Sequence, residues 1–173
     1  MSGPRLRRRM TTTLVCGALA ASLTACTPAD RIGPPSAQVG TWVQATQLGQ
    51  SVGTVLGDAA RVTTAVREHK STAVMHTICA VLLNDVEAAN SNLPSPDSRL
   101  TTLLSDAYGS EGDAANDCYD AGAGSKQLQA KSAGERSRAR ALLLRAMARV
   151  ALLTGHPVST TTTVAPGGGG IFG

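Results

Sequence analysis

Aromatic residues are nearly absent from this sequence. Trp, Tyr and Phe together make up 2% of its 173 residues, and the part expected to fold holds only Trp42, Tyr108 and Tyr119. Sugar-binding sites usually present flat aromatic faces to the sugar ring, so this composition argues against a saccharide-binding protein. The core must instead be built from Ala, Val and Leu.

Residues suited to catalysis or metal binding are also few. The chain has three histidines, His69, His76 and His156, and only His76 lies one helical turn from a cysteine, Cys79. A zinc site needs three or four ligands, and a di-iron bundle needs Glu-x-x-His motifs, which this sequence lacks. No glycine-rich phosphate loop follows a strand, because no alternating β pattern is present. We therefore expect no catalytic residues, no metal and no cofactor.

The N-terminal apolar run is too short to cross a membrane. It extends over the ten residues Leu14–Leu23, whereas a transmembrane helix needs about 20. Four arginines precede it, at positions 5, 7, 8 and 9. A basic segment, a short apolar segment and small residues before a cleavage site are the features of a secretory signal peptide, which we predict for residues 1–25.

The signal segment ends in Leu23-Thr24-Ala25-Cys26, which resembles the lipobox of bacterial lipoproteins. The resemblance implies that Leu23, Thr24 and Ala25 are the recognition positions, that cleavage occurs before Cys26, and that diacylglycerol is joined to the Cys26 thiol. An anchor of two acyl chains is stable, so we expect the protein on the extracytoplasmic face of the cell membrane. The alternative is an ordinary cleaved signal with a chance cysteine.

The basic character of the chain belongs to this leader. Four of the 16 Lys and Arg residues lie in residues 1–25, and all 12 acidic residues lie beyond it, so the mature chain has a net charge of zero. We therefore expect no nucleic-acid partner.

Of the four cysteines, Cys16 leaves with the signal and Cys26 carries lipid. The remaining pair, Cys79 and Cys118, is predicted to form a disulfide in an oxidising compartment.

Both ends of the mature chain have the composition of flexible segments. Residues 26–37 are rich in Pro and small residues and are predicted to be a tether. Residues 156–173 contain a run of threonines and four consecutive glycines, which predicts a disordered tail, either unmodified or carrying O-linked sugar. The folded domain is expected at 38–155.

Apolar residues recur within that domain at intervals of three and four, which predicts helices. The four segments lie near residues 39–68, 71–89, 96–122 and 125–153. Ser95 is expected to cap the third helix and Pro96 to occupy its first turn, while Ser125 begins the fourth and Gly155 ends it. The predicted fold is all-α, an antiparallel four-helix bundle.

The predicted disulfide makes a geometric demand on this bundle. At about 1.5 Å of rise per residue, Cys79 and Cys118 lie at heights about 13 Å apart on neighbouring helices, whereas a disulfide joins Cα atoms at most about 7 Å apart. The connection 92–96 must therefore run past the end of the helix before it. A kink at Gly109 or Gly112 could supply the remainder.

Charge favours pairing of the last two helices. Residues 85–120 hold eight acids and one base, and residues 126–149 hold seven bases and one acid. The basic helix is expected to lie against its acidic neighbour; a basic face meeting anionic lipid is the alternative. Exposed pairs contribute only about 0–1 kcal/mol each, so they bias the arrangement more than they stabilise it.

The fourth helix is apolar on two faces. At 100° per residue, a core stripe is formed by Ala139, Leu143, Ala146 and Val150. An opposite set, which we call the outer stripe, is formed by Ala141, Leu144, Ala148 and Leu152, with Arg138, Arg145 and Arg149 along one border and Arg136 and Arg140 along the other. A helix with two apolar faces offers one of them to a partner, unless the alanines simply serve helix propensity.

The first helix carries glycines at four-residue spacing, Gly49, Gly53 and Gly57. Each destabilises a helix by about 0.5–1 kcal/mol relative to alanine, and the usual compensation is close approach of another backbone. We expect this to be packing within the domain, with self-association as the alternative.

The leader resembles that of the small helical lipoproteins of high-GC Gram-positive bacteria. The resemblance covers residues 1–26 and implies no activity. We expect a non-enzymatic envelope lipoprotein, a helical binding or scaffold module for a protein partner. The alternatives are a carrier or sensor of an apolar ligand within the bundle, favoured by a roomy apolar cavity, and an enzyme with an unrecognised site.

Overall fold

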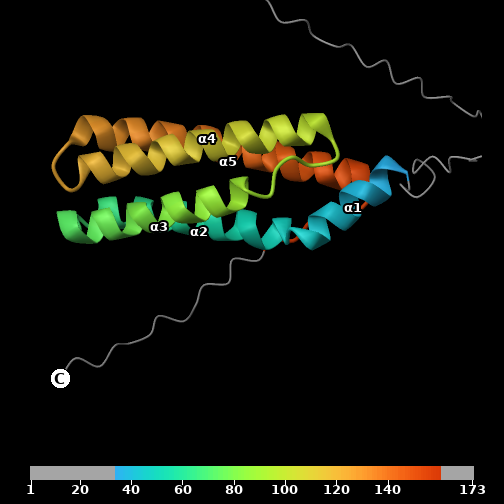
Figure 1. Cartoon of the computed structure of the whole chain (residues 1–173). Coiled ribbons are helices and arrows are strands. Elements are labelled where there is room, and N and C mark those ends of the chain that lie inside the picture. The colour runs from blue at the N-terminus through green and yellow to red at the C-terminus, as the bar shows by residue number, and fades with distance from the viewer. Residues whose placement is uncertain (1–33, 161–173) are drawn as a thin grey trace, which may run out of the picture. The chain divides into compact units, whose positions relative to one another are not determined.

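The computed structural model describes residues 34–160, and these form five helices (Figure 1). The helices are α1 (Pro35–Ala45), α2 (Leu48–Arg67), α3 (Thr72–Asn90), α4 (Ser98–Ala121) and α5 (Lys126–Thr154). No strand occurs within the described part, and the all-α prediction is confirmed. The predicted signal peptide, the lipobox and Cys26, and most of the predicted tether and tail lie outside the described residues.

The prediction of a single first helix is wrong, because the chain breaks at Gln47. Gln47 adopts the left-handed conformation (φ 49°, ψ 41°), and the hydroxyl of Thr46 donates to the carbonyl of Trp42 at 2.8 Å. The Trp42 indole donates to the carbonyl of Asn92 at 3.3 Å, which anchors α1 to the α3–α4 connection. The apolar spacing continues through the break, so periodicity alone could not show it. α1 begins at Pro35, so the last three residues predicted as tether are helical.

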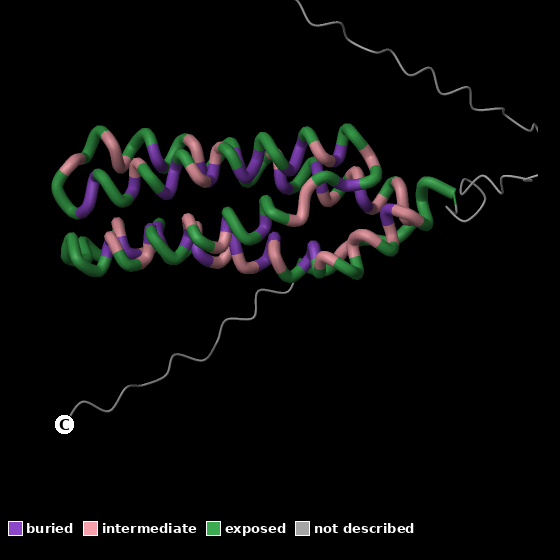
Figure 2. The backbone as a smooth tube through the Cα atoms, viewed as in Figure 1, coloured by how far each residue is buried: buried purple, intermediate pink, exposed green. Residues whose placement is uncertain are grey.

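The four long helices follow one another in alternating directions (Figure 1). Contacts are densest between α4 and α5, then between α3 and α4 and between α2 and α3, whereas α2 and α5 touch only sparsely. Buried positions form inward stripes along α2, α3, α4 and α5, whereas α1 buries only Val39 (Figure 2). The largest fully buried apolar side chains are Met75, Leu82, Leu100, Leu104 and Leu143. The predicted core stripe of the last helix is fully buried.

Short polar side chains set the helix ends. Ser71, Asp97 and Ser125 are N-caps whose side chains accept the N–H three residues on. The prediction that Ser95 caps the third predicted helix, now α4, and that Pro96 occupies its first turn is wrong, because both precede the cap Asp97. The Ser95 hydroxyl instead donates to the Asp97 carbonyl at 2.7 Å. Gly155 ends α5 with φ 76°, a conformation that glycine adopts readily.

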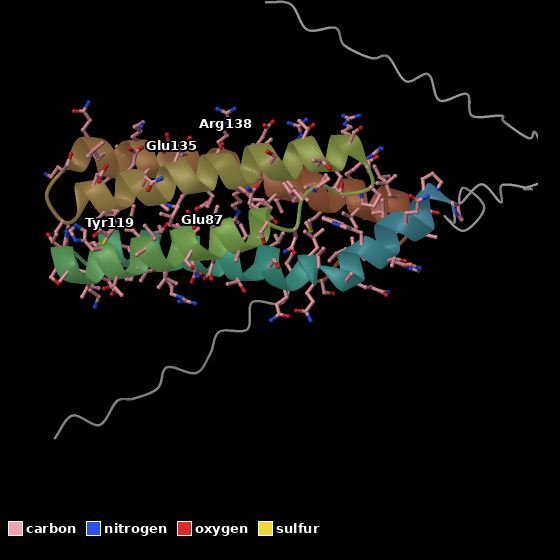
Figure 3. All side chains as sticks on the ribbon, in the orientation of Figure 1. Glu87, Tyr119, Glu135 and Arg138 are labelled. Atoms are coloured by element: carbon pink, nitrogen blue, oxygen red, sulfur yellow. A yellow bond between two sulfur atoms is a disulfide. The ribbon has the colours of Figure 1, made fainter. Side chains whose placement is uncertain are left out.

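Cys79 of α3 and Cys118 of α4 are joined as a disulfide, with their Cα atoms 5.9 Å apart. α4 is one continuous helix, so the offset between the cysteines is met by the connection that follows Asn90, which runs past the end of α3 before α4 begins (Figure 1). His76 stacks on Tyr119 at 4.3 Å beside this bond (Figure 3). Cys79 and His76 are thus both engaged in packing between α3 and α4.

Ion pairs join α5 to α4 at two places. Lys131 lies 2.8 Å from Asp117, and Arg149 lies 2.7 Å from Asp97. The pairing of the basic helix with its acidic neighbour is therefore present in the fold. It uses two of the seven basic residues of α5 and leaves others at the surface.

The chain beyond α5 does not leave the domain at once. Val158 packs against the core, and the carbonyl oxygen of Ser159 lies 2.5 Å from the place a Cβ atom would take on Gly49. The expected close backbone approach is thus present at Gly49, within the domain. The prediction of a disordered tail is wrong for the first residues after Gly155, because apolar contact with α2 holds them.

Candidate ligand-binding groove

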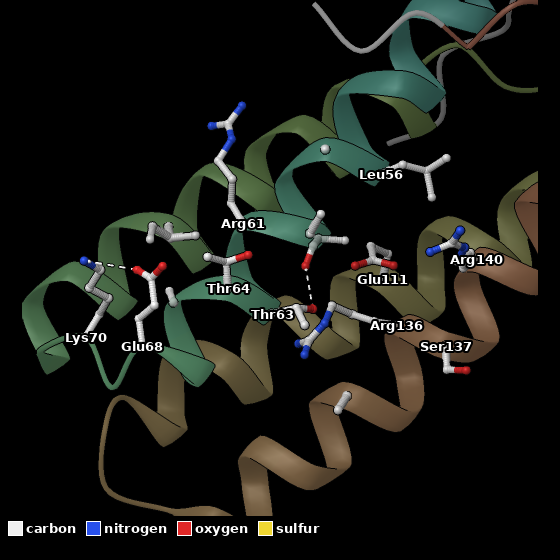
Figure 4. A pocket seen from close by; sticks show the side chains of 16 residues that line it. Leu56, Arg61, Thr63, Thr64, Glu68, Lys70, Glu111, Arg136, Ser137 and Arg140 are labelled. Carbon is white, nitrogen blue, oxygen red and sulfur yellow. Dashed lines mark hydrogen bonds and ion pairs between the residues drawn. The ribbon is translucent and has the colours of Figure 1, made fainter. Parts of the chain in front are cut away.

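A groove with a volume of about 1210 Å³ lies between α2 and α5 (Figure 4). Its apolar lining consists of Leu56, Ala59, Ala60, Ala65, Ile78 and Ala133. Half of the 16 lining positions carry Gly, Ala, Ser or Thr, whose side chains are too short to fill the space between two helices that pack on α3 and α4. The sparse contact between α2 and α5 therefore leaves one side of the bundle open.

Glu111 of α4 lines the groove at its base and is only 1% exposed. Its Oε1 atom has no hydrogen-bond partner within the described part of the chain. Burial raises the pKa of Glu111 to about 7, and the positive charge of Arg136 offsets part of this rise. A buried carboxylate oxygen without a partner is costly, which favours the protonated carboxyl or a hydrogen-bond partner supplied by a ligand.

Arg136 of α5 is also buried, at 9% exposure. Its Nη1 donates to the Ser132 hydroxyl at 2.6 Å, and that hydroxyl donates to the carbonyl of Ala114 at 2.7 Å. Burial lowers the pKa of Arg136, and the nearby Glu111 partly opposes this. The chain of bonds fixes the guanidinium of Arg136 near Glu111, and its remaining N–H groups are available to a ligand.

Other charges at the groove are paired. Arg61 lies 2.9 Å from Asp58, and Lys70 lies 3.2 Å from Glu68. Asp58 is 1% exposed, and burial, together with the neighbouring carboxyl of Asp85, raises its pKa to about 6. The Asp58–Asp85 contact joins α2 to α3, so these groups stabilise the groove wall rather than face a ligand.

Arg140 differs from the other basic residues of the groove. It is exposed, lines the groove one turn after Arg136, and has no ion-pair partner among residues 34–160. In the view of Figure 4, Arg136 and Arg140 lie on either side of Glu111. The groove thus combines an apolar lining with one unpaired positive charge.

The outer stripe is placed at the surface. Leu144 is 57% exposed and Leu152 80% exposed, and Ala141 and Ala148 are exposed beside them. Arg138 and Arg145 border it, and Arg138 points away from the bundle (Figure 3). Arg149 was predicted as a third border residue available to a partner, but it is bonded to Asp97. The role of the stripe in an interaction stays a prediction.

Sequence reasoning missed the groove and its central acid. Glu111 follows Ala107 and Tyr108 by four and three residues and precedes Ala114 and Ala115 by three and four, so it occupies a core position of α4. A single carboxylate on a core face was the available signal. The openness of the α2–α5 side had no such signal, since it depends on how the helices pack.

Within residues 34–160, no group of three or more His, Cys, Asp or Glu side chains is placed to hold a metal ion. No helix in that range is long and apolar enough to cross a membrane. No family model matches the chain, and neither a curated protein nor a solved structure is significantly similar to it.

Proposed function

We propose that this protein is an envelope lipoprotein, held on the extracytoplasmic face of the cell membrane by diacylglycerol on Cys26, and that its helical domain is a non-enzymatic binding module. The basic leader, its short apolar run and the lipobox support the anchor. The four long helices, as an antiparallel bundle, are the rigid scaffold of the module.

The proposed binding site is the groove between α2 and α5, and its ligand is an apolar molecule that the protein carries or senses. The observation that supports this is the apolar lining around a volume of about 1210 Å³, with a few buried polar groups at its base. Sites for small molecules combine such a lining with a small number of placed polar groups. This favours an apolar ligand over a purely scaffolding role.

A neutral fluorescent probe tests the site. N-phenyl-1-naphthylamine should brighten on binding to the mature chain carrying Cys26→Ser, which removes competition from the anchor's own acyl chains. Ala133→Trp should abolish the signal, because the indole fills the groove. Ala141→Trp is the matched control on the exposed face of the same helix. Equal loss in both variants, or no signal in the parent chain, would reject the groove as a binding site.

A protein partner on the outer stripe is the second candidate, favoured by the exposure of Leu144 and Leu152. Isolated exposed leucines are common, but two on one flank of a helix make a patch. A second copy of the chain is one such partner. The double variant Leu144→Lys, Leu152→Lys should abolish self-association measured by sedimentation, or cross-linking to a partner protein in intact cells. If both measurements are unchanged, the outer stripe is not an interaction surface.

A further inference from the structure

The charge balance of the groove points to the polar end of its ligand, and this inference rests on the proposed binding function. Arg61 and Lys70 are each neutralised by an acid within 3.2 Å. Arg136 has the buried carboxyl of Glu111 as its nearby opposite charge. Arg140 has none among the described residues, so the groove presents one uncompensated positive charge.

The position of this charge sets the direction of a bound molecule. Leu56 is near Arg140 in the view of Figure 4, and Glu68 and Lys70 mark the other end. From Leu56 to Glu68 along α2 the groove extends about 18 Å at 1.5 Å per residue. Thr64, Ala65 and Ile78 line the intervening length. A head group at Arg140 would thus leave an extended apolar track for a single chain.

We propose that the ligand is an amphiphile with one anionic head group and one acyl chain, its head bound by Arg140 and Arg136 and its chain lying between α2 and α5. The planar guanidinium of an arginine binds the two oxygens of a carboxylate with two parallel hydrogen bonds, and Arg140 is exposed, unpaired among the described residues and one helical turn from Arg136 in the same groove. When it is protonated, the carboxyl group of Glu111 donates a hydrogen bond to the same head group.

Glu111 does not prevent an anion from binding here. Burial raises its pKa to about 7, so near neutral pH the carboxyl is about half protonated. Its repulsion of an anionic head is then weaker than that of an exposed glutamate. Glu68, the other acid that lines the groove, is bound to Lys70, and Asp58 is buried in the wall and paired with Arg61, so both add little repulsion.

Competition against N-phenyl-1-naphthylamine on the mature Cys26→Ser chain tests this head-group assignment. The competitors are palmitate, hexadecanol and hexadecyltrimethylammonium, which share a chain and differ in head charge. Palmitate should displace the probe at a concentration about tenfold lower than hexadecanol, and the cation should compete least, because a charge-assisted hydrogen bond contributes about this factor.

Variants distinguish a specific role of Arg140 in head-group binding from a general effect of the positive charge of α5. Arg140→Gln should remove most of the preference for palmitate over hexadecanol, and Arg140→Lys should retain part of it. Arg138→Gln, on the outward face of α5, is the control and should leave the preference unchanged.

Equal displacement by all three competitors would overturn the head-group assignment while leaving the groove function intact. Equal effects of Arg140→Gln and Arg138→Gln would overturn the role of Arg140. No probe binding at all would overturn the proposed function itself.

Discussion

Arg149 of α5 binds both carboxylate oxygens of Asp97, the residue that caps α4. Its Nε donates to Oδ1 at 3.2 Å and its Nη2 to Oδ2 at 2.7 Å, while Oδ1 also accepts the N–H of Leu100 at 2.7 Å. This pairing holds the pKa of Asp97 below its ordinary value. One arginine of the last helix therefore fixes the first turn of the helix beside it.

Arg149→Gln should lower the stability of the domain, because it loosens this cap. A cap interaction and a partly exposed ion pair together contribute about 1 kcal/mol. Arg145→Gln, one turn earlier and without an ion pair in the described part, should change stability by much less. Thermal unfolding followed by circular dichroism measures both, and equal melting temperatures would show that the Arg149–Asp97 pair contributes nothing.

Gly49→Ala should release the segment after α5 from the bundle. The added Cβ would lie 2.5 Å from the Ser159 carbonyl and 2.8 Å from a methyl group of Val158, so the segment must move away. Gly109→Ala has open space around it and should instead stabilise its helix by about 0.5–1 kcal/mol. Faster hydrogen exchange at the amides of residues 158–160 in the first variant only is the expected result; unchanged protection there would contradict it.

The mature, non-reduced protein should contain no titratable thiol. Cys79 and Cys118 form the disulfide, and Cys26 is expected to carry lipid. Replacing Cys79 and Cys118 by Ala should reduce the free energy of unfolding by about 2–4 kcal/mol. Thiol counting in denaturant without a reductant tests whether the protein contains free thiols. Two reactive thiols per chain would mean that the bond does not form and that His76 and Cys79 must be considered again.

Stability should decrease as the pH rises from about 4.5 to about 7. The pKa of Glu111 is raised by burial from 4.5 in the unfolded chain to about 7 in the fold, so the unfolded state loses the proton first and is favoured over this range. Glu111→Gln should flatten the dependence, whereas the exposed Glu87→Gln should not. Urea unfolding at several pH values checks this; a curve identical in the parent and in Glu111→Gln would contradict it.

Cys26→Ser should yield a protein without lipid. Mass spectrometry of the parent chain purified from membranes should find an N-terminal Cys26 carrying diacylglycerol. The variant should be uncleaved or soluble. A parent chain that begins at another residue, with an unmodified thiol, would remove the anchor from the proposed function.

Local chemistry determined which parts of the fold could be predicted. The core stripe of α5, its start at Ser125 and its end at Gly155 follow from spacing and capping, which act within a few residues. The break at Gln47 lies beside a contact between residues distant in the sequence, the Trp42 indole and the Asn92 carbonyl, and the apolar spacing around it continues unchanged.

The candidate site was less accessible to prediction for the same reason. Arg136 and Arg140 were recognised as bordering a helix face, but the groove exists only because α2 and α5 are held apart by the packing of α3 and α4. Arg149 and Arg145 have the same apparent position on a helical wheel. Only the placement of Asp97 at the start of α4 distinguishes them.

The Cys79–Cys118 bond determines how this bundle can deform. α2 with α3 and α4 with α5 are two helical hairpins, and the chain between α3 and α4 joins them at one end. The disulfide joins them again, seven residues into α3 and three before the end of α4, close to the opposite end. Rotation of one hairpin relative to the other is therefore limited to an axis along α3 and α4. Such a rotation changes the width of the groove between α2 and α5. A bulky occupant would be admitted by a small rotation about this axis, and reduction of the disulfide would free the hairpins to separate.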